Sequence, residues 1–227
     1  MSESAIKHSE APGKVSKHRA DLDALHCFLR EYPTLALAHP LGHAISERLK
    51  QIQTVVVESS VWFRGLVCTN GAPDPQDFLP PDPCRIVVPE QRFNHQGQRV
   101  FYLSNGERGA ALECRDDGDD NRDIWIQRFR TAALSKILDL ASAASGSDQI
   151  VIEAATYCGE APDDIKRPPH LQPEYSVPRF VADCARLASA SGLLAPSVEE
   201  GTNLVLFQWN DHEVRPEGKP QKFVLRL

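Results

Sequence analysis

Two arginines stand where their charge could hold an anionic ligand. Arg64 lies inside the apolar run of residues 61–67, where an unpaired guanidinium would be costly to bury. It therefore needs either a carboxylate, in a structural ion pair, or a bound anion. Arg92 follows a proline-rich stretch, and its guanidinium could either grip a diphosphate through two parallel hydrogen bonds or face solvent.

Three further side chains could take part in chemistry. Tyr102 ends a predicted strand, where it could stack on an aromatic ring or fill the core. Glu113 follows small alanine side chains on a predicted helix, which leaves its carboxylate either near a ligand or in solvent. Ser197 follows Pro196 and could donate to a ligand oxygen or only form a turn. None of these residues identifies a function by itself.

The elements that must position these residues are indicated by apolar spacing and residue type. Helical spacing predicts helices from about residue 21, over residues 45–52, over residues 134–141 and from Ser176, where Pro178 falls in the first turn. Runs of β-branched, aromatic and apolar residues predict strands at residues 61–67, 99–103, 124–126, 150–154, 203–209 and 222–227.

The segments between these elements carry turn and loop signals. Prolines across residues 73–89 exclude a helix or a central strand and predict a long surface loop that could line a site. Ser104 and Glu107 fit a capping box, which predicts a helix from Asn105 that includes Glu113. Residues 116–123 read as an acidic turn, and residues 211–220 read as a turn-rich insertion.

The irregular order of strands and helices favours an α+β fold over a parallel βαβ array. Neither G-x-G-x-x-G nor the P-loop pattern occurs, so the common phosphate-cradling motifs are absent from the sequence. We expect residues 1–18 to form a disordered tail, residues 19–54 an N-terminal helical extension and residues 55–227 the main domain.

Composition narrows the class of protein. The 227 residues are 41% hydrophobic and 25% charged, which is typical of a globular chain with one sizeable core. No apolar run approaches the roughly 20 residues of a membrane span, and the first residues lack a signal-peptide pattern, so we expect a cytoplasmic protein. A net charge of −6 argues against direct binding of nucleic acid. The six cysteines lack zinc-ligand spacing, so we expect reduced thiols and no metal.

Five short motifs occur in an order that resembles the RES-domain family, named for its Arg, Glu and Ser residues. The resemblance runs from about residue 61 to residue 207. The motifs are F-R-G at 63–65, R-F-N-x-x-G-x-x-x-F-Y-L-S at 92–104, A-A-L-E at 110–113, E-Y-x-V-x-R-F-V-A-D at 174–183, and P-S-V at 196–198 with N-L-V-L-F at 203–207.

The resemblance implies an ADP-ribosyltransferase-like fold, in which a split β-structure with flanking helices binds NAD in a cleft. It implies the toxin of an Xre/RES toxin–antitoxin pair, with NAD as substrate, an Xre-type antitoxin as partner, and a homo-oligomer or a toxin–antitoxin hetero-oligomer as the assembly. The implied reaction is cleavage of the nicotinamide–ribose bond by water or phosphate. The alternatives are ADP-ribosyl transfer to a protein, and a non-catalytic interaction protein that keeps the fold.

By matching position, the resemblance also assigns roles to residues of this chain. The implied catalytic residues are Arg64, Tyr102, Glu113 and Ser197. The implied NAD contacts are Arg64, Arg92, Asn94, Tyr102 and Ser104. We therefore expect Arg64 and Glu113 to face one pocket shaped for a dinucleotide. One departure stands out, since Glu199 and Glu200 follow P-S-V where many family members have a basic residue.

Overall fold

A single eight-stranded sheet organises the chain, with strand order β1-β5-β6-β7-β3-β2-β4-β8. The computed structural model describes residues 17–69, 71–114, 123–142, 148–160, 171–197 and 199–224. Neighbouring strands are antiparallel except β5 and β6, which are parallel. The strands are β1 (Thr54–Val57), β2 (Val61–Cys68), β3 (Phe101–Ser104), β4 (Asp123–Thr131), β5 (Leu134–Asp139), β6 (Gly192–Pro196), β7 (Thr202–Leu206) and β8 (Val214–Phe223).

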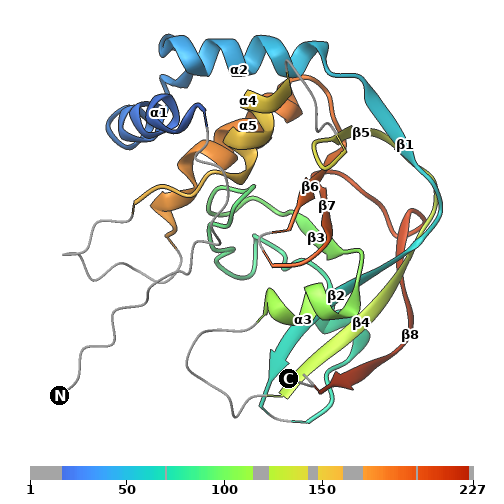
Figure 1. Cartoon of the computed structure of the whole chain (residues 1–227). Coiled ribbons are helices and arrows are strands. Elements are labelled where there is room, and N and C mark those ends of the chain that lie inside the picture. The colour runs from blue at the N-terminus through green and yellow to red at the C-terminus, as the bar shows by residue number, and fades with distance from the viewer. Residues whose placement is uncertain are drawn as a thin grey trace, which may run out of the picture.

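Most of the helices gather at one end of the molecule, and α3 lies apart from them beside β2 and β4 (Figure 1). The described α-helices are α1 (Arg19–Glu31), α2 (Pro40–Gln51), α3 (Glu107–Leu112), α4 (Gln149–Thr156) and α5 (Ser176–Leu187). In the helical group, α5 contacts α1, α2 and α4. The α+β class is therefore confirmed, and so are the two N-terminal helices.

The two faces of the sheet bury different cores. Val205 of β7 packs with apolar side chains of α1, α2, α4 and α5. Leu204 of the same strand packs on the opposite face with Trp62, Phe101 and Phe129. Because side chains alternate along a strand, each sheet residue can be assigned to the helix-covered face or to the far face. We use these two names below.

The structure contradicts two neighbouring predictions: a predicted helix is a strand, and the strand predicted after it is a helix. Residues 134–139 form β5 instead of a helix. Lys136 adopts a left-handed φ of 59° within this strand. Leu134 and Ile137, three residues apart, therefore pack into the same core, which gives the sequence a helix-like apolar spacing. Residues 149–156 form α4 instead of a strand, and Val151, Ala154 and Ala155 provide its buried helical stripe.

Two boundaries were also wrong. Helix α3 begins at Glu107 after Gly106 and has no side-chain cap, since Ser104 is the last residue of β3. Most of the predicted turn-rich insertion is strand β8, which pairs with β4 from Val214 to Phe223. Its prolines at 216 and 220 are tolerated because β8 lies at the sheet edge.

Most of the remaining predicted strands and helices are confirmed. Of the strand predicted at 222–227, residues 222 and 223 belong to β8, and residues 225–227 lie outside the described residues. The strands at 61–67, 99–103, 124–126 and 203–209 correspond to β2, β3, part of β4 and β7, and the helix from Ser176 is α5. Residues 73–89 form the predicted loop, with one short 3-10 turn at Pro75–Phe78 that Asp74 caps. The acidic turn at 116–123 lies almost entirely outside the described residues.

Candidate functional site around Glu113

Glu113 is held by two side chains that donate to the same carboxylate oxygen. The Ser197 hydroxyl donates to Oε1 at 2.6 Å, and the Asn203 amide donates to Oε1 at 2.5 Å. Glu113 follows the last residue of α3 and is exposed, whereas Asn203 is buried at the start of β7. The two bonds orient the carboxylate and leave Oε2 without a described hydrogen-bond partner, so this oxygen can face a ligand.

Helix α3 can bring Glu113 to the sheet because two glycines allow close packing. A Cβ atom on Gly65 would lie 2.4 Å from the Ala110 carbonyl oxygen, and one on Gly109 would lie 2.7 Å from Ser104 Oγ. Both distances are far shorter than a normal contact. Ser104 is therefore a buried packing neighbour of α3, and its hydroxyl lies 3.5 Å from the Gly106 amide.

Ser197 is positioned by its bonds to residues 199–201, and we call residues 197 and 199–201 the Ser197 loop. The Ser197 amide donates to the Gly201 carbonyl at 3.0 Å, and Gly201 has a φ of 82°, which favours glycine. The Ser197 hydroxyl accepts from the amides of Glu199 and Glu200 at 3.2 and 3.3 Å. The same hydroxyl thus closes the loop and donates to Glu113.

Arg92 is buried and ties α4 to the residue before Ser197. Its Nε and Nη2 donate to the Ala155 carbonyl at 2.9 and 2.7 Å, and its Nη1 donates to the Pro196 carbonyl at 2.9 Å. Burial lowers the pKa of Arg92, while the charge of Glu113 opposes that shift. Arg92 therefore contributes positive potential beside Glu113, and each terminal nitrogen keeps a second hydrogen for a ligand.

Tyr102 and Asn94 form a buried network next to Arg92. The Tyr102 hydroxyl donates to Asn94 Oδ1 at 2.9 Å and accepts from the Phe93 amide at 3.0 Å, and Asn94 Nδ2 donates to the Pro89 and His95 carbonyls. Burial raises the pKa of Tyr102, which keeps the hydroxyl protonated. The network fixes the backbone that carries Arg92.

Arg64 lies on the far face, so the structure does not bring it to Glu113. Phe63 of β2 pairs with Ser104, and Ser104 pairs with Asn203. Since neighbouring residues alternate, Arg64 points away from that face. Its guanidinium carbon lies 5.4 Å from the centre of the Phe101 ring, which belongs to the far-face core. A pocket shared by Arg64 and Glu113 therefore stays a prediction.

The surroundings of Arg64 explain how the charge is tolerated. The side chain is partly buried, and its Nη1 has no hydrogen-bond partner among the described residues. Burial lowers the pKa of Arg64 to about 10, while interactions with Cys114 and Tyr102, which lie within electrostatic range, oppose that shift. No described carboxylate pairs with it. The contact with the Phe101 ring offers a cation–π interaction in place of an ion pair. A catalytic or NAD-binding role for Arg64 stays a prediction.

Sequence reasoning missed two residues of this site. Asn203 is inside the N-L-V-L-F motif, but its bond to Glu113 depends on how α3 packs against β7. Tyr175 precedes α5 and is close enough to Arg92 and Glu113 to interact electrostatically with both. A polar residue at the start of an otherwise apolar strand was the available signal for Asn203.

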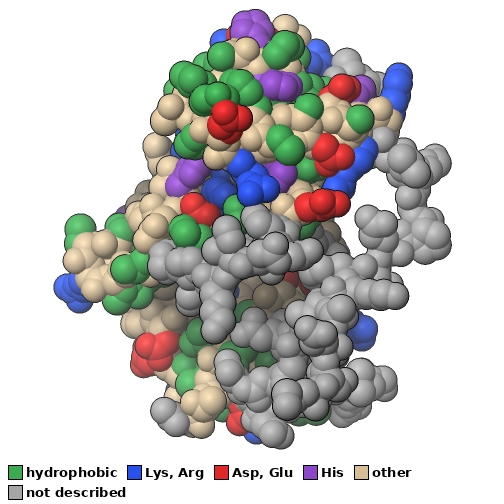
Figure 2. Space-filling model, turned by 90° about the vertical axis from the view of Figure 1, so that its left-hand side faces the viewer, with side chains coloured by type: hydrophobic (Ala, Val, Ile, Leu, Met, Phe, Trp, Pro, Cys, Tyr) green, Lys and Arg blue, Asp and Glu red, His purple; other side chains and the backbone are tan. Residues whose placement is uncertain are grey.

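Positive side chains mark the side of the molecule below the helices. Figure 2 shows Lys and Arg side chains gathered in the middle of this side. Apart from what the figure shows, two arginines of α5 have acidic partners: buried Arg179 pairs with Glu90 at 3.4 Å, and Arg186 pairs with Asp183 at 3.2 Å. Like Arg92, these arginines are therefore held in place by protein partners.

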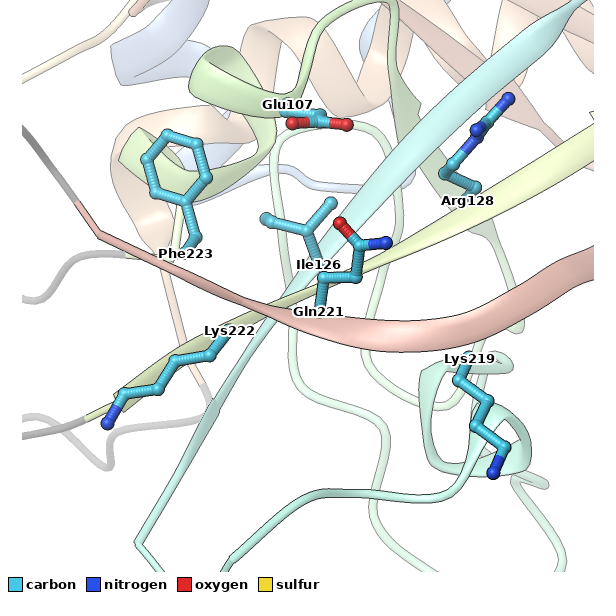
Figure 3. A pocket seen from close by; sticks show the side chains of 7 residues that line it. All are labelled: Glu107, Ile126, Arg128, Lys219, Gln221, Lys222 and Phe223. Atoms are coloured by element: carbon cyan, nitrogen blue, oxygen red, sulfur yellow. The ribbon is translucent and has the colours of Figure 1, made fainter.

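A separate small pocket lies between α3, β4 and the edge strand β8 (Figure 3). Its lining residues are Glu107, Ile126, Arg128, Lys219, Gln221, Lys222 and Phe223. The pocket of about 40 Å³ has room for a few water molecules and is too small to enclose a dinucleotide. It contains none of the predicted site residues.

No group of three or more His, Cys, Asp or Glu side chains in the described ranges could hold a metal ion. No helix in those ranges is long and apolar enough to cross a membrane.

Comparison with known proteins identifies the family. The profile of the RES domain matches residues 86–226, more than half of the chain, so the chain belongs to the RES-domain family. This range contains Arg92, Tyr102, Glu113, Ser197 and Asn203, but Arg64 lies before it. No curated protein matches the sequence.

One solved structure was also compared with the chain. The crystal structure of the M. tuberculosis MbcT–MbcA toxin–antitoxin complex contains a chain that is 13% identical, with a TM-score of 0.46. The match covers 81% of this chain and 93% of the other.

Proposed function

We propose that this RES-domain protein cleaves NAD at the nicotinamide–ribose bond and acts as the toxin of a toxin–antitoxin pair. The observation that carries the proposal is the fixed carboxylate of Glu113, which is bonded through Oε1 to Ser197 and Asn203 and lies in the electrostatic range of Arg92. Membership of the RES-domain family supports the choice of NAD, since the sequence resemblance implies this substrate.

The chemistry suits a carboxylate held in this way. As nicotinamide leaves, positive charge develops on the ribose, and a nearby carboxylate stabilises that charge in the transition state. Glu113 Oε2 is the oxygen available for this role, because Oε1 is engaged by two donors. Ser197 and Asn203 prevent the side chain from turning away as the charge develops.

The remaining residues have roles in binding and positioning within this proposal. Arg92 supplies positive potential for the diphosphate and holds Pro196 beside Ser197. Tyr102 and Asn94 fix the segment that carries Arg92. Ser104 supports the packing of α3. Because Arg64 lies on the far face, the proposal does not depend on it.

The test is incubation of the purified protein with NAD, with the products resolved by mass. We expect nicotinamide release by the wild type and its near-complete loss in Glu113→Gln, which keeps the shape of the side chain and removes its charge. Arg92→Lys, which keeps a charge but cannot make the three bonds, should lose less activity. Failure of the wild type to release nicotinamide with water, phosphate or cell extract would reject the proposal.

Transfer of ADP-ribose to a protein is the alternative outcome of the same chemistry. Radiolabelled NAD and gel electrophoresis of a cell extract separate the two reactions, since only transfer leaves label on a protein band. If Glu113→Gln inhibited growth as strongly as the wild type, a non-catalytic interaction protein would be the better description.

We further propose an Xre-type antitoxin as the partner in the cytoplasm, in a hetero-oligomeric complex. The compared MbcT–MbcA structure is a toxin–antitoxin complex, and the proposal takes its partner type from the family resemblance. Co-expression with the neighbouring open reading frame tests this expectation. Co-purification and loss of nicotinamide release in the complex would support it, and two proteins that elute separately would contradict it.

A further inference from the structure

Tyr175 lies at the end of a 3-10 turn, Pro173–Tyr175, directly before α5. The Tyr175 amide donates to the Gln172 carbonyl at 3.1 Å, which closes this turn. The carbonyl of the preceding residue, Glu174, accepts from the Gly159 amide at 2.9 Å. The backbone of Tyr175 is therefore joined to the segment that follows α4.

The same segment is fixed by the N-terminal helix α1. His26 of α1 bonds through Nδ1 to Ser176 Oγ at 2.7 Å and through Nε2 to the Glu160 carbonyl at 3.4 Å. A Cβ atom on Gly159 would lie 2.6 Å from the His26 ring, so the imidazole packs directly against the backbone there. Helix α1, which precedes the residues 86–226 that match the RES-domain profile, thus holds the backbone on which Tyr175 lies.

Arg92 meets Tyr175 at this end of α4. The Arg92 guanidinium donates to the carbonyl of Ala155, in the last turn of α4. Burial lowers the pKa of Arg92, and Tyr175 opposes this shift more strongly than Glu113 does. Burial raises the pKa of Tyr175, and the charges of Arg92 and Glu113 both act on it as well. Because such interactions weaken with distance, the Tyr175 hydroxyl lies near the guanidinium and within range of the carboxylate.

The Tyr175 hydroxyl is available to a ligand. The side chain is only partly buried, and its raised pKa keeps the hydroxyl protonated near neutral pH. This hydroxyl has no hydrogen-bond partner among the described residues. Tyr102 and Tyr157, in contrast, donate to Asn94 and Asp23 at 2.9 and 2.7 Å. Tyr175 therefore offers a bound molecule an O–H donor that the described protein groups do not use.

We propose that Tyr175 binds the substrate by donating its hydroxyl to a hydroxyl oxygen of the nicotinamide ribose. The inference rests on the proposed function and adds a specificity-determining residue to that site. In NAD this ribose links the diphosphate, which Arg92 attracts, to the bond that Glu113 helps to break. A donor within range of both side chains therefore faces the ribose, whose hydroxyl oxygens are hydrogen-bond acceptors.

The first experiment separates ligand binding from structure. The Kd of NAD is measured by calorimetry in Glu113→Gln, a background in which cleavage should be nearly abolished, with and without Tyr175→Phe. We expect Tyr175→Phe to raise the Kd on the order of fivefold, as loss of one hydrogen bond does. The free energy of unfolding should stay unchanged, because the hydroxyl has no described protein partner to lose.

Tyr157→Phe is the matched control. It removes a hydroxyl at the same end of α4 that bonds to Asp23 of α1. This variant should lower the free energy of unfolding and leave the Kd of NAD unchanged. A purely structural role of Tyr175 would give the same pattern in Tyr175→Phe, and that result would overturn the inference.

The second experiment locates the contact with two analogues of NAD, which lack either the 2′- or the 3′-hydroxyl of the nicotinamide ribose. Tyr175→Phe should leave the Kd unchanged for the analogue without the bonded hydroxyl, and should still raise the Kd of the other by about fivefold. An equal effect on NAD and on both analogues would show that Tyr175 contacts another part of the ligand, which would overturn the assignment to a ribose hydroxyl.

The possible results separate this inference from the proposed function. Nicotinamide release by the wild type, together with an unchanged Kd in Tyr175→Phe, would overturn the inference and leave NAD cleavage intact. An absence of both NAD binding and nicotinamide release in the wild type would reject the proposed function and this inference with it.

Discussion

The helix-covered face and the far face of the sheet hold a charged side chain differently. On the helix-covered face, the Glu113 carboxylate accepts from Ser197 and Asn203 at 2.6 and 2.5 Å, although Asn203 Oδ1 has no partner in the described structure. On the far face, Arg64 has no described carboxylate partner, and its Nη1 has no hydrogen-bond partner. Partnered groups are held in one geometry, and such positioning is what a site requires.

The contrast changes the interpretation of the two residues with the strongest sequence signal. Glu113 is oriented by neighbours that come from β7 and the Ser197 loop, which is consistent with a catalytic role. Arg64 is a partly buried charge in contact with Phe101 of the far-face core. A buried cation without a carboxylate partner costs stability instead of adding to it.

The largest expected effect is the loss of activity in Glu113→Ala. We expect nicotinamide release to fall about 1000-fold, since removal of one preorganised electrostatic group typically costs 100- to 1000-fold. Because the change also leaves the buried Asn203 amide without its described acceptor, we expect the thermal unfolding midpoint to fall modestly. Turnover and unfolding are measured on the same sample. Equal activity in Glu113→Ala and wild type would show that the carboxylate held on the helix-covered face is not catalytic.

The next effect concerns stability on the far face. Arg64→Met removes a buried charge and keeps much of the side-chain volume, so we expect the free energy of unfolding to rise by about 1–3 kcal/mol. Nicotinamide release should stay within a few-fold of wild type. Urea unfolding and the NAD assay test both expectations. If activity fell 100-fold with stability unchanged, Arg64 would be catalytic and the two faces would have to be reinterpreted.

A smaller effect is expected for Tyr102→Phe. The variant removes the hydroxyl that bonds to Asn94 and to the Phe93 amide, and leaves both groups buried without that partner. We expect the free energy of unfolding to fall by about 1–2 kcal/mol, with a moderate loss of activity through displacement of Arg92. Denaturant titration measures the first change. Phe101→Tyr, which alters the neighbouring far-face residue, would show whether any aromatic change on β3 has the same effect.

The smallest expected effect is a pH dependence from His26, which is buried on the helix-covered side and bonds to Ser176 Oγ at 2.7 Å. Burial lowers its pKa below the ordinary 6.5, so the unfolded chain binds this proton more readily than the folded protein. The contribution of His26 to the free energy of unfolding is then fully present above about pH 6.5, and it is lost as the pH falls below that value. The loss grows as the pH falls from about 6.5 through the lowered pKa of the folded protein.

The His26 contribution is measured by chemical unfolding at several pH values in wild type and His26→Gln. Between pH 7 and pH 5 we expect the free energy of unfolding to depend less on pH in the variant. Only the wild type buries an imidazole that takes up a proton when the chain unfolds. Parallel curves for the two proteins would show that other groups cause the pH dependence.

Several elements were predictable because local pattern and tertiary environment agree. The apolar stripe of α5 and the run of β2 both lie where the sequence placed them. The pattern failed at β5, where Lys136 shifts the phase of a strand, and at α4, where β-branched residues occupy a helix. In both cases packing against the sheet outweighed local preference.

The sequence by itself determined the family, through the ordered motifs, and the identity of Arg92, Tyr102, Glu113 and Ser197 as candidates. Only the tertiary structure decided which of the candidates meet. The side of a strand on which a residue lies depends on its pairing register, and the register of β2, β3 and β7 places Asn203 with Glu113 and Arg64 on the opposite face. Register is set by contacts between segments far apart in the chain, which residue types and spacing do not encode locally.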